Sequence, residues 1–251
     1  MADLTRRDFT QQALGSLLTY SLLETVIGHD LLAAEIKPTV QQWLIDLESL
    51  SNDVKQQQLK QLDWQKKIEE LFSRVELPEL LRLIDFDKLA SESKLVDNGA
   101  RRITFKFPDV EGLPKKLVFG KQIFGLKKGR SVVPHGHNNM ATAFLVLRGD
   151  LRGRHYDRLE DHDDHVIIRP TIDRTFEPGG CSTVSDYKDN VHWFEAITEP
   201  AYIFNIHVMN IRPGSELPTG RVYVNPEGEK LSDGRIRAPR IGYKQSLELF
   251  G

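Results

Sequence analysis

Gly129-Arg-Ser-Val-Val-Pro134-His135-Gly136-His137 is the stretch of this 251-residue sequence that decides the fold. Two histidines one residue apart point to the same side of a β-strand, because strand side chains alternate between the two faces. The imidazoles of His135 and His137 can therefore bind one ion together. The apolar run at 142–147 reads as a second strand, which ends at the turn Arg148-Gly149-Asp150.

A third histidine, His192, lies in the strand-like run Val191-His-Trp-Phe194. If the sheet closes into a barrel, this run brings His192 to the same place as His135 and His137. Neutral imidazole suits Fe, Ni, Cu and Zn, so the ligand type alone leaves the metal open. The alternatives are an exposed pair of strand histidines at 135 and 137, and a core histidine at 192.

The residues around these histidines resemble the cupin family over about residues 100–212. The first cupin motif is matched in its spacing by Gly129, His135, His137 and Gly149. In the second motif the histidine matches His192, whereas the proline and asparagine positions hold Tyr187 and Ala196. The resemblance implies a β-barrel that holds a metal ion inside.

One departure narrows the resemblance: this chain has Thr142 where cupins usually have a glutamate ligand. A cupin with three histidines and no glutamate is similar to the thiol dioxygenases, whose iron is held by three histidines. That family carries a further histidine, not itself a ligand, fifteen residues after the third one, and His207 stands at this position. The resemblance implies Fe(II), with another divalent metal as the alternative, and oxidation of a small thiol to its sulfinate with O2.

The same resemblance implies roles for further residues. His207 is expected to support catalysis rather than hold the metal. Thr142 and Met209 stand where some thiol dioxygenases form a Cys–Tyr cross-link, so no cross-link can form, and both side chains are expected to border the cavity. The candidates for binding a substrate carboxylate are Arg102, Arg154 and Tyr156.

The whole chain reads as one mainly β domain, a single cupin (double-stranded β-helix, or jelly-roll) barrel with an N-terminal α-helical cap. Apolar residues at helical spacing predict the cap at 36–98, with Pro38 and Pro78 near helix starts. Short strands and turn signals predict the barrel with its metal site at 99–214, including strands at 102–107 and 117–119. The segment 215–251 is rich in Pro, Gly and charge, and is expected to wrap the barrel.

The first 35 residues read as an export signal rather than as part of the fold. Thr5-Arg-Arg-Asp-Phe9 resembles the twin-arginine motif, a moderately apolar stretch follows at 13–28, and Ala33-Ala34 offers a small-residue cleavage site. The expected partner is the twin-arginine export machinery, and the expected location is periplasmic or otherwise extracytoplasmic. The alternative is an N-terminal helix that stays on a cytoplasmic protein.

Composition excludes several other classes. The net charge of −2 gives no sign of nucleic-acid binding, and no apolar run of about 18 residues predicts stable membrane insertion. The single cysteine, Cys181, excludes an internal disulfide. The open alternatives to a thiol dioxygenase are another three-histidine cupin dioxygenase and a non-catalytic cupin that binds a small ligand.

Overall fold

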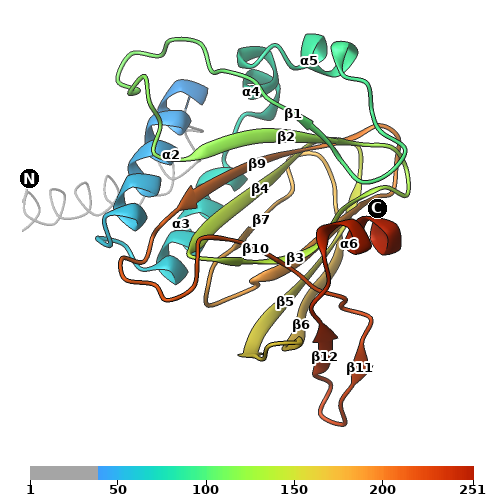
Figure 1. Cartoon of the computed structure of the whole chain (residues 1–251). Coiled ribbons are helices and arrows are strands. Elements are labelled where there is room, and N and C mark those ends of the chain that lie inside the picture. Colours follow the sequence, from blue (N-terminus) through green and yellow to red (C-terminus); the bar gives the residue numbers. More distant parts are fainter. Residues whose placement is uncertain (1–38) are drawn as a thin grey trace, which may run out of the picture. The chain divides into compact units, whose positions relative to one another are not determined.

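The computed structural model describes residues 39–251, so the predicted leader at 1–35 lies outside the described residues and stays a prediction. The described residues form two antiparallel β-sheets that face each other, with helices on the outer side of one of them (Figure 1). Among these residues no helix combines the length and apolarity that a membrane span requires.

The smaller sheet has the strand order β1-β2-β9-β4-β7. Its strands are β1 (Arg101–Ile103), β2 (Gly120–Leu126), β9 (Ala201–Met209), β4 (Met140–Arg148) and β7 (Cys181–Val184). The larger sheet has the order β10-β3-β8-β5-β6-β12-β11. Its strands are β10 (Gly220–Tyr223), β3 (Ser131–Asn138), β8 (Val191–Ala196), β5 (Leu151–Asp161), β6 (His165–Phe176), β12 (Ile236–Pro239) and β11 (Glu229–Lys230).

The eight strands from β2 to β9 follow a jelly-roll path, because the chain crosses repeatedly from one sheet to the other. This path places β2-β9-β4-β7 in one sheet against β3-β8-β5-β6 in the other. Antiparallel double-sheet jelly rolls of this kind are the architecture of cupins. The predicted fold class, a mainly β cupin barrel, is therefore confirmed.

The barrel interior is filled by apolar side chains from both sheets, including Phe124, Phe144 and Phe194. A separate apolar core lies on the outer face of the smaller sheet. There Ile123 and Phe204, which alternate with inward-facing residues of β2 and β9, pack against the helices. The smaller sheet is thus buried on both faces, which explains why its two central strands β4 and β9 are largely apolar along their length.

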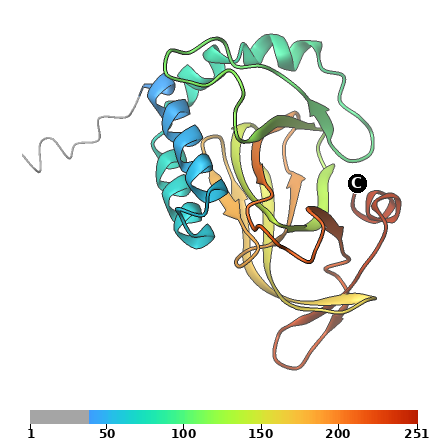
Figure 2. The ribbon, with the colours of Figure 1, turned by 60° about the vertical axis from the view of Figure 1, so that its left-hand side comes forward.

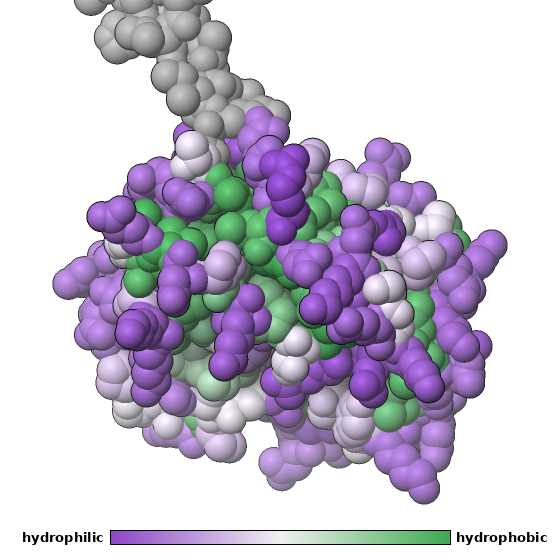
Figure 3. Space-filling model, turned by 90° about the horizontal axis from the view of Figure 1, so that it is seen from above, coloured by the Kyte–Doolittle hydropathy of each residue, from purple (hydrophilic) through white to green (hydrophobic). Residues whose placement is uncertain are grey.

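The helices of the cap are α2 (Val40–Lys55), α3 (Gln61–Ser73), α4 (Leu77–Leu83) and α5 (Phe86–Glu92). They lie along the outer face of the smaller sheet (Figures 1 and 2). Thr39 caps α2 by accepting a hydrogen bond from the Gln42 N–H. The buried indole of Trp43 donates to the Leu71 carbonyl, which ties α2 to α3. Seen from above, hydrophobic surface shows between the hydrophilic side chains on this side of the molecule (Figure 3).

The connection from β1 to β2 differs from the strands predicted at 102–107 and 117–119. Only 101–103 forms a strand, and 104–119 is irregular. Pro108 and Pro114 lack the N–H that a strand needs to pair. The aromatic rings of this segment pack instead against Phe204 on the outer face of the sheet.

The C-terminal segment does more than wrap the barrel. Strand β10 extends the larger sheet by pairing with β3, and β12 extends it at the other side by pairing with β6. Helix α6 (Tyr243–Phe250) contacts β3 through the Ser131 hydroxyl, which donates to the Phe250 carbonyl. The segment thus supplies the strand that lies beside the candidate metal-binding strand.

Candidate metal centre

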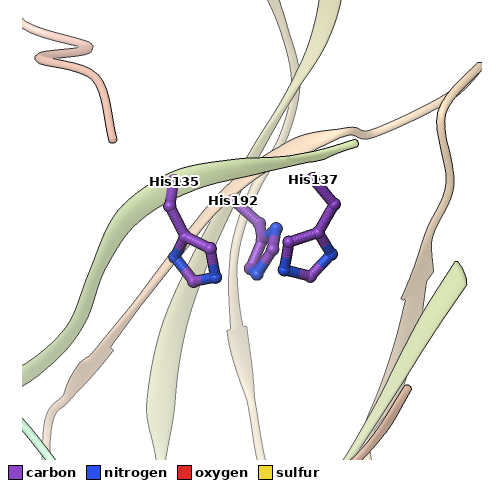
Figure 4. A group of neighbouring side chains, drawn as sticks. All are labelled: His135, His137 and His192. Carbon is purple, nitrogen blue, oxygen red and sulfur yellow. The ribbon is translucent and has the colours of Figure 1, made fainter. Parts of the chain in front are cut away.

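Two neighbouring strands bring three histidine side chains together inside the barrel. His135 and His137 come from β3, and His192, from β8, pairs directly with His135. Their rings converge (Figure 4), and one ligand nitrogen from each lies within 4.8 Å of the others. All three are buried, with exposed fractions of 3% or less. The convergence expected from the sequence is therefore observed.

A local irregularity in β3 aims the two histidines. The pairing of β3 with β8 shifts between Val132 and His135, which places Pro134 in a bulge. A bulge accommodates proline inside a sheet, and its extra residue re-aims the side chains that follow. Val132, His135 and His137 consequently all face the barrel interior, where they line one cavity.

Each ring is held by a hydrogen bond at Nδ1. The Nδ1 atoms of His135 and His192 lie 2.8 and 3.2 Å from the carbonyl oxygens of Val133 and Asn190. A carbonyl oxygen can only accept, so Nδ1 carries the proton and Nε2 keeps its lone pair. The Nε2 atoms of His137 and His192 are buried and have no hydrogen-bond partner within the described residues. Free, buried imidazole nitrogens facing one point fit a bound divalent metal.

The third ring is held by a side chain. The hydroxyl of Thr142 on β4 lies 3.1 Å from Nδ1 of His137. Thr142 lines the same cavity, as the sequence predicted, and occupies the position at which cupins usually have their glutamate ligand. It therefore supports a histidine where a glutamate would bind the metal itself.

Electrostatics keep the three histidines neutral. Burial lowers the pKa of His192 to about 3, and the neighbouring His155 adds to this effect. Burial, followed by the charges of the neighbouring histidines, lowers the pKa of His137 well below its usual value. The pKa of His135 is lowered in the same way. Neutral imidazole is the form that binds metals, so the site is prepared for an ion at neutral pH.

The cavity around the three rings is narrow and contains no carboxylate. Its free volume is ≈ 10 Å³, about the space of one water molecule. Its lining residues are Phe124, Val132, His135, His137, Met140, Thr142, Phe144, His192, Asn205, His207 and Arg221. Three neutral histidines would not compensate the positive charge of a bound divalent ion, so such an ion would favour an additional, anionic ligand. The larger parts of this ligand must lie toward the opening of the cavity.

His207 lines this cavity from β9, in register with Thr142 on β4 and Gly120 on β2. Its ring lies over Gly120, where any side chain would overlap it. Burial lowers the pKa of His207 to about 4, and the charges of Arg221 and Arg102 lower it further. His207 is therefore neutral, inside the cavity and outside the three-histidine cluster, where the sequence placed it.

Met209 does not lie where the sequence predicted. It is the last residue of β9, and the chain turns at Asn210 in the left-handed conformation. Its side chain is consequently 44% exposed at the rim. Met140, its partner on β4, lines the cavity instead. The prediction that Met209 lines or borders the cavity is therefore wrong: Met209 shares a strand face with His207, but it lies at the end of β9, beyond the residues that line the cavity.

Two of the three residues predicted to bind a carboxylate lie elsewhere. Arg154 is on the outer face of β5, where its guanidinium contacts the Glu195 carboxylate at 3.1 Å and stacks on Trp193. Tyr156 follows a bulge in β5 and is buried in a small apolar cluster with Val191. Both predictions are wrong because strand alternation and this bulge turn the two side chains away from the cavity.

Arg102, the third predicted residue, and Arg221, which was not predicted, lie on edge strands of the two sheets. Arg102 lies on β1, and its charge contributes to the lowered pKa of His207. Arg221 lies on β10 opposite His137 and lines the cavity, although the sequence analysis did not single it out. The alternating run Gly220-Arg-Val-Tyr223 before the turn-forming Asn225-Pro-Glu-Gly228 was the signal that could have identified a strand there.

Comparisons with known proteins show similarity at the level of fold. No family model matches the chain, and no curated protein matches it. Among solved structures it is similar to an uncharacterised double-stranded β-helix protein from Klebsiella pneumoniae, with 10% identity and a TM-score of 0.36 over 53% of this chain and 85% of that one. A cupin superfamily protein from Desulfitobacterium hafniense gives 16% identity and a TM-score of 0.32 over 48% and 87%.

Two 11S globulins are also among the similar structures. The 11S globulin from Wrightia tinctoria, whose structure is described as revealing an auxin binding site, has 14% identity and a TM-score of 0.36 over 52% of this chain. The chain spans 28% of that globulin and 21% of procruciferin from Brassica napus.

Proposed function

We propose that this protein is a metal-dependent dioxygenase that oxidises a small thiol to its sulfinate. The observation that carries the proposal is the set of three buried, neutral histidines in a cavity without a carboxylate. Fe(II) is the proposed metal, held by His135, His137 and His192. Arg221 lines the same cavity, and its positive charge favours an anionic substrate.

The proposed reaction is R–SH + O2 → R–SO2⁻ + H⁺. Sulfur loses four electrons, dioxygen gains them, and both oxygen atoms end on sulfur. When bound, the metal would supply adjacent positions for a thiolate and O2, which lowers the entropic barrier to their meeting. The neutral ligand set supports this proposal because the uncompensated charge of the ion lowers the free energy of a bound thiolate.

In this proposal the residues around the metal position the substrate and keep the cavity dry. His207 is neutral and lines the cavity beside Asn205, so it can exchange a hydrogen bond with a bound substrate. Phe124, Phe144 and Met140 exclude water from the reacting atoms. The substitution His207→Gln should retain the metal and lower turnover about 10- to 100-fold, as other changes beside metal ligands do.

The direct test is oxygen uptake by the metal-loaded protein with a panel of thiols, read together with mass detection of the sulfinate. Cysteine, 3-mercaptopropionate, cysteamine and mercaptosuccinate cover thiols with and without carboxylates. His192→Ala should abolish both uptake and metal retention. A protein that holds metal but consumes no oxygen with any thiol would favour another three-histidine cupin dioxygenase or a ligand-binding cupin.

A further inference from the structure

Two edge strands, one from each sheet, present an arginine at the opening of the cavity. On β1, Arg102 lies directly opposite Phe124 of β2. On β10, Arg221 lies directly opposite His137 of β3. Side chains of directly paired residues project from the same face of a sheet. Because Phe124 and His137 both line the cavity, Arg102 and Arg221 also lie on the interior face of their sheets.

Both arginines act electrostatically on one residue. Arg221 lines the cavity together with His207, and the charges of Arg221 and Arg102 add to the effect of burial, which lowers the pKa of His207. His207 stands on β9, next to β2 and facing the edge of the other sheet. The interior face thus carries one arginine from each sheet: Arg221 on the strand beside His137, and Arg102 two strands away from His207.

Neither arginine has an acidic partner within residues 39–251. Arg152 and Arg154 on β5, by contrast, are paired with Asp173 at 2.7 Å and with Glu195 at 3.1 Å, respectively. Arg102 and Arg221 form no ion pair and no side-chain hydrogen bond in the part of the chain that the structure describes, and both are exposed. No carboxylate lines the cavity behind them. Two unneutralised guanidinium groups at one opening form a site for two negative charges.

We propose that this opening binds a dianionic substrate, a small thiol that carries two carboxylates, with one carboxylate on Arg102 and the other on Arg221. This inference rests on the proposed thiol oxidation and names its substrate class. The cavity beside the histidines has room for little more than a sulfur-sized group, so the two carboxylates must remain at the opening. A thiol with one carboxylate would leave one guanidinium without a partner.

The binding test uses non-thiol probes and does not depend on turnover. Calorimetric titration of the metal-loaded protein should give tighter binding of succinate than of propionate. Arg102→Gln and Arg221→Gln should each weaken succinate binding about 10- to 100-fold, the range expected for a lost charged hydrogen bond. Arg101→Gln is the matched control: Arg101 pairs with Gly125, on the opposite face of the sheet, and its substitution should change little.

The activity test separates this inference from the proposed function. Mercaptosuccinate should be oxidised with a higher kcat/KM than 3-mercaptopropionate, and Arg102→Gln should remove the preference. Oxidation of 3-mercaptopropionate at an equal rate, with Arg102→Gln no different from Arg101→Gln, would overturn the two-arginine site and leave thiol oxidation standing. Arginine-dependent succinate binding without oxidation of any thiol would support the dianion site and reject the proposed reaction. Equal binding of succinate and propionate would reject the site directly.

Discussion

At the candidate metal centre, the histidine rings are fixed before any ion arrives. Backbone carbonyl oxygens hold Nδ1 of His135 and His192, and the Thr142 hydroxyl holds Nδ1 of His137. Fixing the rings lowers the entropy lost when an ion binds, and at His135 and His192 the carbonyl acceptors select the tautomer that leaves Nε2 free. Thr142 is the only one of these three groups that a side-chain substitution can remove.

Thr142→Val should weaken metal binding about 10-fold while leaving the fold intact, because valine has nearly the same shape but cannot bond to His137 Nδ1. The dissociation constant can be measured by competition with a chelating dye. Thr142→Ser retains the hydroxyl and should bind metal with close to the original affinity. Equal affinities for the valine and serine variants would show that the hydroxyl does not orient the ring.

Individual residues could be predicted where spacing alone decides their position. His135 and His137 share a face by alternation, and His192 and His207 were placed by their intervals in the resembled family. Tyr156 could not be placed because a bulge after His155 breaks the alternation, and Met209 could not be placed because β9 ends there, beyond the cavity. Bulges and strand ends depend on tertiary packing, which a periodic pattern does not encode.

At the scale of elements, β3, the strand that carries His135 and His137, is bound by hydrogen bonds to the loop that precedes β8. The Asn190 side chain donates to the carbonyl oxygens of His137 and Ser185, both at 2.8 Å, and accepts the His137 N–H at 3.2 Å. Gly136 makes room for this side chain, since a methyl group there would lie 2.6 Å from Asn190 Oδ1. Gly136 is therefore needed for the close approach of two elements.

Gly136→Ala should lower the free energy of unfolding by about 1–3 kcal/mol, the usual range for overpacking, and should weaken metal binding by displacing Asn190 and His137. Urea unfolding and metal titration would measure the two effects. Gly220→Ala on the neighbouring strand β10 is the control, because a methyl group there meets no atom within 4 Å. Similar losses at both positions would contradict a specific contact with Asn190.

Elements with strong local signals were predicted, and those that depend on distant partners were not. The amphipathic stripes of α2 and α3 and the apolar run of β4 specify their structure locally. Strand β10 is short and polar, and it forms only because the edge of β3 is available to pair with it. The segment 104–119 has alternating residues, but Pro108 and Pro114 lack a pairing N–H, and the rings of Phe105 and Phe107 pack against the core on the outer face of the sheet.

At the scale of the whole molecule, the buried histidines make stability depend on pH. His155 is fully buried on β5, and burial lowers its pKa from 6.5 to about 3. Above pH 6.5 it is neutral in both states. Between pH 6.5 and 3 the unfolded chain binds a proton that the folded protein excludes, so stability is lost as pH falls, by about 1.4 kcal/mol per pH unit for each such group.

In the metal-free protein, His155→Leu should therefore lower the number of protons bound on unfolding by about one between pH 6 and 4. The free energy of unfolding should then fall less steeply as the pH decreases. Urea unfolding at several pH values gives the slope. Phe176→Leu, a change in an aromatic neighbour that does not titrate, should lower stability by a similar amount at every pH. An unchanged slope in the His155→Leu variant would mean that this side chain gains access to water or a partner in solution.

Metal binding should stabilise the whole molecule, because an ion that binds only the folded state shifts the folding equilibrium by mass action. At a free concentration of about 100 times the dissociation constant, the gain is about 2.7 kcal/mol. For a domain of this size, that gain raises Tm by about 5–10 °C. Thermal unfolding with and without Fe(II) under anaerobic conditions, followed by chelator, measures the shift and its reversal.

Two variants locate the origin of this shift. His135→Ala should abolish it, because the remaining two histidines cannot form the three-nitrogen site. His162→Gln should retain it, because His162 lies in the exposed acidic hairpin between β5 and β6, where Arg240 and Arg235 neutralise Asp161 and Glu160. A shift that survives His135→Ala but disappears in His162→Gln would move the metal from the barrel interior to the hairpin, and with it the chemical basis of the proposed function.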